Sequence, residues 1–89
     1  MVHFVYILYS DSVDKYYIGS CGNVDVRLSR HNAGATISTK SGRPWKVVYR
    51  EEFNSKTEAI KYEYYLKRMK SRVFIEKILN KNNAASSAG

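Results

Sequence analysis

The chain has 89 residues, a formal net charge of +7 and a hydrophobic fraction of 44%. This length allows one small domain, and the apolar content argues against a disordered chain. The single cysteine, Cys21, excludes a disulfide within the chain and a cysteine-based zinc site, and it fits a reducing compartment. Because the sequence has neither an apolar stretch of about 20 residues nor a secretion signal, we expect a cytoplasmic protein that does not contact a membrane.

The positive charge is concentrated in the second half of the chain. Residues 1–39 carry three basic and three acidic side chains, whereas residues 40–89 carry twelve basic and five acidic side chains, a net of +7. Such a basic half is typical of proteins that bind a polyanion, most simply nucleic acid, although a solvated basic surface has the same composition. The basic residues expected to contact nucleic acid are Lys40, Arg43, Lys67, Lys70 and Arg72.

The first twenty residues predict a β-hairpin. Residues 4–9 form an unbroken apolar and aromatic run, which predicts a strand covered on both faces. Residues 10–14 are polar and predict a turn, and residues 16–20 predict a second, antiparallel strand.

A helix is expected next, with Asn23 as its N-cap and Gly34 as its stop. Four residues of this helix recur at the spacing of one face, which we expect to point at the rest of the protein. They are Val24, Arg27, Leu28 and His31.

Residues 35–44 predict a polar loop with room for one helical turn, and residues 45–53 predict a third strand. We expect Trp45, Val47 and Tyr49 on one face of this strand, with Phe53 continuing that face. The six tyrosines other than Tyr6 and Tyr17 are expected to be core aromatics.

Residues 55–58 form a capping box that begins a helix of about four turns. Its inward stripe is expected to contain Ala59, Tyr62, Leu66 and Met69. A second helix is expected after Ser71, with Phe74, Ile75, Ile78 and Leu79 facing inward. We expect one domain over residues 1–81 and a flexible tail over residues 82–89.

Glu63 is a carboxylate inside an otherwise apolar helical stripe. A buried carboxylate is costly unless it is paired or bound to a metal ion. One interpretation is an ion pair with Lys67, four residues further along the helix. The other is coordination of Mg²⁺, whose remaining ligands would be water and substrate phosphate. The two histidines, His3 and His31, do not complete a zinc site.

Three further side-chain types are candidates for chemistry, and each has a structural alternative. Arg27 suits phosphate oxygens, but its stem also covers apolar surface. His31 is able to donate to phosphate or move a proton, or it serves only to satisfy the helix end. Tyr6 and Tyr17, expected on adjacent strands, are core aromatics unless nearby cations lower their pKa values.

Taken in order, these residues resemble the successive motifs of the GIY-YIG endonuclease family, in particular its small stand-alone bacterial members. The similarity covers about residues 3–79. Each motif alone is weak evidence for the family, but all five in this order are strong evidence. Val5 stands where the first motif has glycine. The matching segments are Val5-Tyr6-Ile7, Tyr17-Ile18-Gly19, Arg27-Leu28-Ser29-Arg30-His31-Asn32, residues 44–49 and residues 58–63.

The resemblance implies an α+β fold, a three-stranded antiparallel sheet flanked by helices. It also implies metal-dependent hydrolysis of DNA phosphodiester bonds with one Mg²⁺ (or Mn²⁺), in DNA repair or recombination. By motif match Glu63 would hold the metal, Arg27 would stabilise the phosphate, and His31 would contact phosphate or relay a proton. Tyr6 and Tyr17 would line the site, and Gly19 would be a structural position.

Two other hypotheses stay open from the sequence. One is a non-catalytic nucleic-acid binding module on the same fold, since fold alone does not confer activity. The other is a small interaction domain whose basic helix binds an acidic protein.

Overall fold

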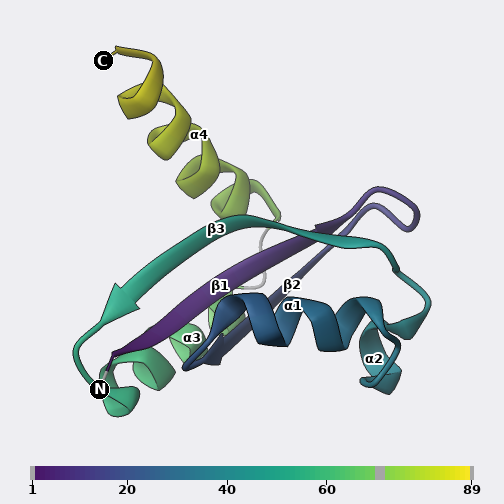
Figure 1. Ribbon diagram of the computed structural model, residues 1–89. Helices are drawn as coiled ribbons and strands as arrows, with labels where there is room; N and C mark the ends of the chain where they lie inside the picture. The colour runs from purple at the N-terminus through teal and green to yellow at the C-terminus, as the bar shows by residue number, and fades with distance from the viewer. Residues whose placement is uncertain (1, 70–71, 89) are drawn as a thin grey trace.

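The computed structural model describes residues 2–69 and 72–88, and it confirms the α+β fold with a three-stranded antiparallel sheet flanked by helices (Figure 1). The elements in chain order are β1 (His3–Ser10), β2 (Lys15–Cys21), α1 (Val24–Asn32), α2 (Ile37–Lys40), β3 (Trp45–Phe53), α3 (Lys56–Met69) and α4 (Arg72–Ala88).

The sheet has the order β2-β1-β3, so that β1 is the central strand and β2 and β3 are its edges. Helix α1 covers one face and α3 covers the other, whereas α4 leads away from the sheet (Figure 1). Each face has its own hydrophobic cluster, one containing Val24 of α1 and the other containing Ala59 and Leu66 of α3.

Strand β1 serves both clusters because successive side chains of a strand point to opposite faces. Val5 and Ile7 pack on the α3 side, and Tyr6 and Leu8 pack on the α1 side. All four are buried, so the prediction of a strand covered on both faces is confirmed.

The predicted face pattern of β3 is wrong, because a β-bulge interrupts the strand. Val47 pairs with Leu8 and Tyr49 pairs with Ile7, which leaves Val48 as the extra residue. Val47 and Trp45 therefore pack on the α1 side, but Tyr49 packs on the α3 side. One inserted residue reverses the faces of all residues that follow it.

The predicted start of α3 at Ser55 is confirmed, since the Glu58 amide donates to Ser55 Oγ at 3.2 Å and Ser55 so caps the helix. The core prediction is wrong for Met69, which ends the helix with 44% of its surface exposed. Tyr64 and Tyr65 are exposed as well, because they lie outside the buried stripe of Ala59 and Leu66.

Helix α4 packs against the α3-side cluster through Phe74, Ile75, Ile78 and Leu79, as expected. Its backbone stays helical through Ala88, past the predicted domain end at residue 81. The alanine-rich sequence there has no glycine or proline to stop a helix before residue 89, which lies outside the described residues. No helix in the described part of the chain is long and apolar enough to cross a membrane.

Candidate active site at the edge strand

Tyr6 and Gly19 face each other across β1 and β2. A Cβ atom at position 19 would lie 2.5 Å from the Tyr6 hydroxyl oxygen, closer than real contacts allow. The Tyr6 ring therefore occupies the space that any other residue at position 19 would need.

An aromatic cluster surrounds Tyr6 on the α1 face of the sheet. The Tyr17 ring lies 4.9 Å from the His31 ring and 6.5 Å from the Tyr6 ring, measured between centroids. Trp45, at the start of β3, lies 6.3 Å from Tyr17. Helix α1 supplies His31, and Asn23 caps that helix by accepting from the Val26 amide at 3.1 Å, as expected.

His31 is 1% exposed, and both of its ring nitrogens have partners. Nε2 lies 3.2 Å from the Tyr6 hydroxyl, and Nδ1 lies 2.8 Å from Thr39 Oγ1. The Thr39 hydroxyl in turn donates to the Thr36 carbonyl at 3.3 Å. A buried ring with both nitrogens occupied does not reach a phosphate directly in this arrangement, so its position supports an action through Tyr6.

Burial determines the protonation states of Tyr6 and His31. It raises the pKa of Tyr6, with a further rise from Tyr17 and an opposing effect of the Arg27 guanidinium. It lowers the pKa of His31, and Arg27 adds to that lowering. Near neutral pH Tyr6 is therefore a phenol and His31 a neutral imidazole, and Tyr6 is a poor base.

Arg27 is half-buried on the same face of α1 as His31. Its guanidinium opposes the rise in the pKa of the Tyr6 hydroxyl, which places its charge close to that group. The structure therefore brings Tyr6, Tyr17, Arg27 and His31 together on one face of the sheet.

Glu63 lies on the opposite face, where α3 crosses β2. Its Oε1 accepts from Ser20 Oγ at 2.6 Å, and its Oε2 lies 2.7 Å from Lys67 Nζ. The Glu63 side chain is 17% exposed, and the ion pair expected from the helix spacing is present. Ser20 belongs to β2, the strand that carries Tyr17 and Gly19 on its other face. Glu63 and the aromatic cluster therefore lie on opposite faces of the sheet, with strand β2 between them.

The chemistry of Glu63 fits a small hard cation. One carboxylate oxygen already faces a positive charge, the Lys67 ammonium, and an adjacent hydroxyl holds the other oxygen. Among the described residues there is no group of three or more histidine, cysteine, aspartate or glutamate side chains that could hold a metal ion. Glu63 would therefore be a lone protein ligand, with water and phosphate completing the shell, as Mg²⁺ accepts.

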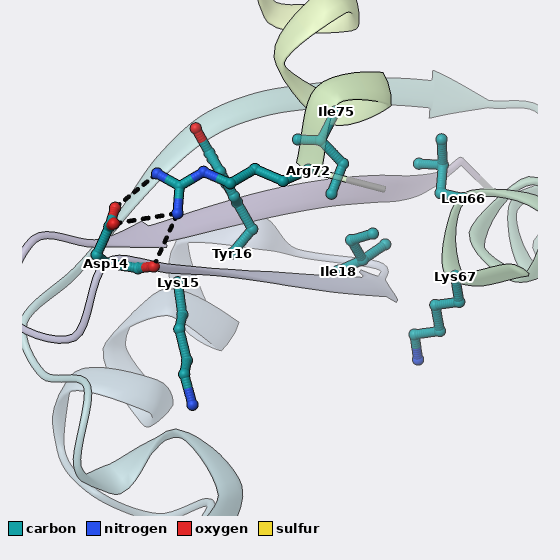
Figure 2. A pocket seen from close by; sticks show the side chains of 8 residues that line it. All are labelled: Asp14, Lys15, Tyr16, Ile18, Leu66, Lys67, Arg72 and Ile75. Carbon is teal, nitrogen blue, oxygen red and sulfur yellow. Dashed lines mark hydrogen bonds and ion pairs between the residues drawn. The ribbon is translucent and has the colours of Figure 1, made fainter. Parts of the chain in front are cut away.

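A cavity of about 420 Å³ adjoins Lys67 on this side of the sheet. Figure 2 shows Lys15 and Lys67 extending away from α4, and Arg72 held by Asp14. Arg72 Nη2 lies 2.6 Å from Asp14 Oδ1, and Arg72 Nε lies 3.1 Å from Glu76 Oε2. Arg72 and the Tyr9 hydroxyl hold the pKa of Asp14 at about 2. The cavity is lined by Asp14, Lys15, Tyr16, Ile18, Leu66, Lys67, Arg72 and Ile75.

The basic residues expected to contact nucleic acid do not form one surface. Lys40 and Arg43 are exposed at the end of α2 and in the loop after it, where Arg43 Nε donates to the Lys40 carbonyl at 2.9 Å. Lys67 and Arg72 are ion-paired on the α3 side. Lys70 lies outside the described residues.

Two residues of this site, Ser20 and Thr39, were not predicted from the sequence. Ser20 had a signal, because strand alternation places it on the face opposite Tyr17 and Gly19, where the helix bearing Glu63 packs. Thr39 had none, since a threonine in a polar loop gives no sign that it will be buried against a histidine.

The fold and the site together define a small α+β domain that carries the motif residues on the two faces of a three-stranded sheet. A family model described as the GIY-YIG catalytic domain matches residues 2–83, so the chain belongs to the GIY-YIG family. This confirms the resemblance inferred from the motifs. Members of this family are nucleases that bind nucleic acid and generally need a divalent metal ion.

Similar proteins are small members of the same family. A UPF0213 protein of Staphylococcus haemolyticus is 42% identical over 66 residues, covering 73% of this chain and 79% of that protein. A UPF0213 protein of Staphylococcus aureus is 41% identical over the same length. The solution NMR structure of a UPF0213 protein from Bacillus halodurans superposes with a TM-score of 0.57 at 34% identity, covering 90% of this chain and 84% of that one.

Proposed function

We propose that this protein is a divalent-metal-dependent endonuclease that hydrolyses DNA phosphodiester bonds. The observation that carries the proposal is the edge strand β2, which holds Tyr17 beside the buried Tyr6 and His31 and, through Ser20, fixes Glu63. One short strand thus links the aromatic cluster on one face of the sheet with Glu63 on the other.

Arg27 is the group that stabilises the charge developing on the phosphate. A guanidinium matches phosphate oxygens in geometry and stays charged at every relevant pH. Its half-buried position gives it a low-dielectric surrounding, which strengthens its effect.

Tyr17 orients the attacking water. Tyr6 is unsuited to take a proton because burial raises its pKa and its hydroxyl is occupied by His31. Tyr17 is only half-buried, so of the two tyrosines it is the one that solvent reaches. In this assignment of roles Tyr6 and His31 position Arg27, and Tyr17 contacts the reacting groups.

Glu63 would hold the Mg²⁺ or Mn²⁺ ion, in place of the Lys67 ammonium. When bound, such an ion neutralises charge on the leaving oxygen. Lys67 is half-exposed, so it is free to move from Glu63 to a DNA phosphate. Lys40 and Arg43 on the other side of the sheet, with Lys70 and Arg72, complete the proposed DNA contacts. A cytoplasmic location and a role in DNA repair or recombination complete the proposal.

One observation favours a second candidate, a non-catalytic nucleic-acid binding module. Both oxygens of Glu63 are satisfied by Ser20 and Lys67, so the fold does not need a metal ion to balance this carboxylate. In that case binding would depend on salt but not on Mg²⁺.

The test is cleavage of labelled supercoiled plasmid, a flap, a four-way junction, single-stranded DNA and RNA, with Mg²⁺ and with EDTA. Wild type is compared with Glu63→Ala and with Glu52→Ala, an exposed glutamate on β3. We expect Mg²⁺-dependent cleavage of DNA that only Glu63→Ala loses, while DNA binding is retained. Salt-sensitive binding without cleavage by any of the three proteins would support the binding module instead.

A further inference from the structure

Thr39 is fully buried in the short helix α2, and nothing in the family motifs or the proposed mechanism assigns it a role. We propose that Thr39 is a positioning residue, whose hydroxyl fixes the tautomer of His31 and thereby the orientation of the Tyr6 hydroxyl beneath Arg27. The catalytic consequence rests on the proposed function, whereas the tautomer does not.

Counting hydrogens along the chain of contacts gives the tautomer. A threonine hydroxyl has one hydrogen, and Thr39 donates it to the Thr36 carbonyl. With the hydrogen placed there, both contacts of Thr39 Oγ1 are hydrogen bonds, so we assign Oγ1 as the acceptor in its 2.8 Å contact with His31 Nδ1, which then carries a hydrogen. Because burial and Arg27 keep the imidazole neutral, Nε2 has no hydrogen.

The tautomer then orients Tyr6. With Nε2 as an acceptor, the Tyr6 hydroxyl donates to His31 at 3.2 Å. This directs the hydrogen of Tyr6 inward and leaves the lone pairs of its oxygen for the Arg27 guanidinium. With the opposite tautomer Nε2–H would compete with Arg27 for the same lone pairs.

Thr39 is held by a second, independent contact. The Trp45 indole donates to the Thr39 backbone carbonyl at 2.6 Å. This bond does not involve the hydroxyl, so Thr39→Val, which keeps the shape of the side chain, should leave α2 in place. Thr39→Ser keeps the hydroxyl and should rescue the effect.

The experiment is ¹⁵N NMR of the histidine rings, using the long-range couplings that distinguish protonated from unprotonated nitrogens. The chain has two histidines, so His3→Gln assigns the His31 signals. The matched control is Thr36→Val, which removes a half-buried threonine hydroxyl that makes no capping hydrogen bond. We expect Nδ1–H in wild type, Thr39→Ser and Thr36→Val, and a shift toward Nε2–H in Thr39→Val.

Kinetics test the catalytic consequence. Thr39→Val should lower kcat about tenfold with little change in KM, as expected for one lost buried hydrogen bond acting indirectly. An Nε2–H tautomer in wild type, or an unchanged tautomer in folded Thr39→Val, would overturn the proposal. If wild type cleaves nothing, the proposed function fails while the NMR result still decides the role of Thr39 at His31.

Discussion

The Tyr6 hydroxyl stands directly over the α-carbon of Gly19, where a side chain at position 19 would begin. Tyr6 has no room to give way, because it is 1% exposed and bonded to His31. The tyrosine of the first motif and the glycine of the second are thus one packing unit.

We expect Gly19→Ala to destabilise the fold by about 1–3 kcal/mol, the usual effect of overpacking, and to displace Tyr6 from His31. Thermal unfolding and the His31 NMR signals measure these two effects. Gly22→Ala is the matched control, since a Cβ there meets nothing within 4 Å. Equal stability of Gly19→Ala and Gly22→Ala would show that the Tyr6 ring is free to move.

Replacing Arg27 should separate catalysis from packing. We expect Arg27→Ala to lower the cleavage rate by about 10²–10³-fold, comparable to losing one preorganised electrostatic group. Its effect on unfolding should be small because the side chain is only half-buried. Arg30→Ala, an exposed arginine on the same helix, serves as the control. A protein that melts with unchanged specific activity would assign Arg27 to packing alone.

Removing Lys67 should improve metal binding in the absence of DNA. Lys67→Ala deletes the cation that Mn²⁺ must displace from Glu63. We expect tighter Mn²⁺ binding, measured by electron paramagnetic resonance, together with weaker DNA binding. Lys61→Ala, an exposed lysine of the same helix, should change neither. Unaltered Mn²⁺ affinity in Lys67→Ala would mean that the ion binds elsewhere.

Stability should fall as the pH decreases from 7 toward 5. The folded protein lowers the pKa of His31 below its usual 6.5, so the unfolded chain binds more protons in this window. One such group changes the free energy of unfolding by at most about 1.4 kcal/mol per pH unit. His31→Gln should flatten this slope and His3→Gln should not, as followed by urea unfolding. Asp14 loses its contribution between its ordinary pKa of 3.8 and its lowered pKa of about 2, which lies below this window.

Arg72 should contribute less to DNA affinity than Lys40. Asp14 and Glu76 already neutralise Arg72, whereas Lys40 has no ion pair among the described residues. We expect Lys40→Ala to reduce the slope of log affinity against log salt by about one, and Arg72→Ala to reduce it less. Equal reductions would indicate that Arg72 leaves Asp14 when DNA binds.

The sequence predicted the elements well because their local signals were strong. The Asn23 cap, the Ser55 cap and the apolar run of β1 all depend on interactions within a few residues. The bulge at Val48 could not be predicted, since it is visible only in the pairing of β3 with β1.

The site was predictable only in part. Helix spacing placed Arg27 and His31 together, and the pair of Glu63 with Lys67 follows the same rule. The burial of His31 against Thr39 depends on how α2 folds back, which no local pattern contains. The separation of Glu63 from Tyr6 likewise follows from which face each helix covers.

The bulge in β3 marks the position at which this strand could lose a residue. The first half of the strand belongs to the α1-side core through Trp45, and the second half belongs to the α3-side core through Tyr49. Deleting Val48 would restore regular pairing and keep Val47 opposite Leu8 and Tyr49 opposite Ile7, so Tyr49 and Phe53 would stay in the α3-side core. Side chains along this strand can be exchanged for others of similar size, but a residue lost or gained away from the bulge would turn the side chains beyond it toward the opposite core.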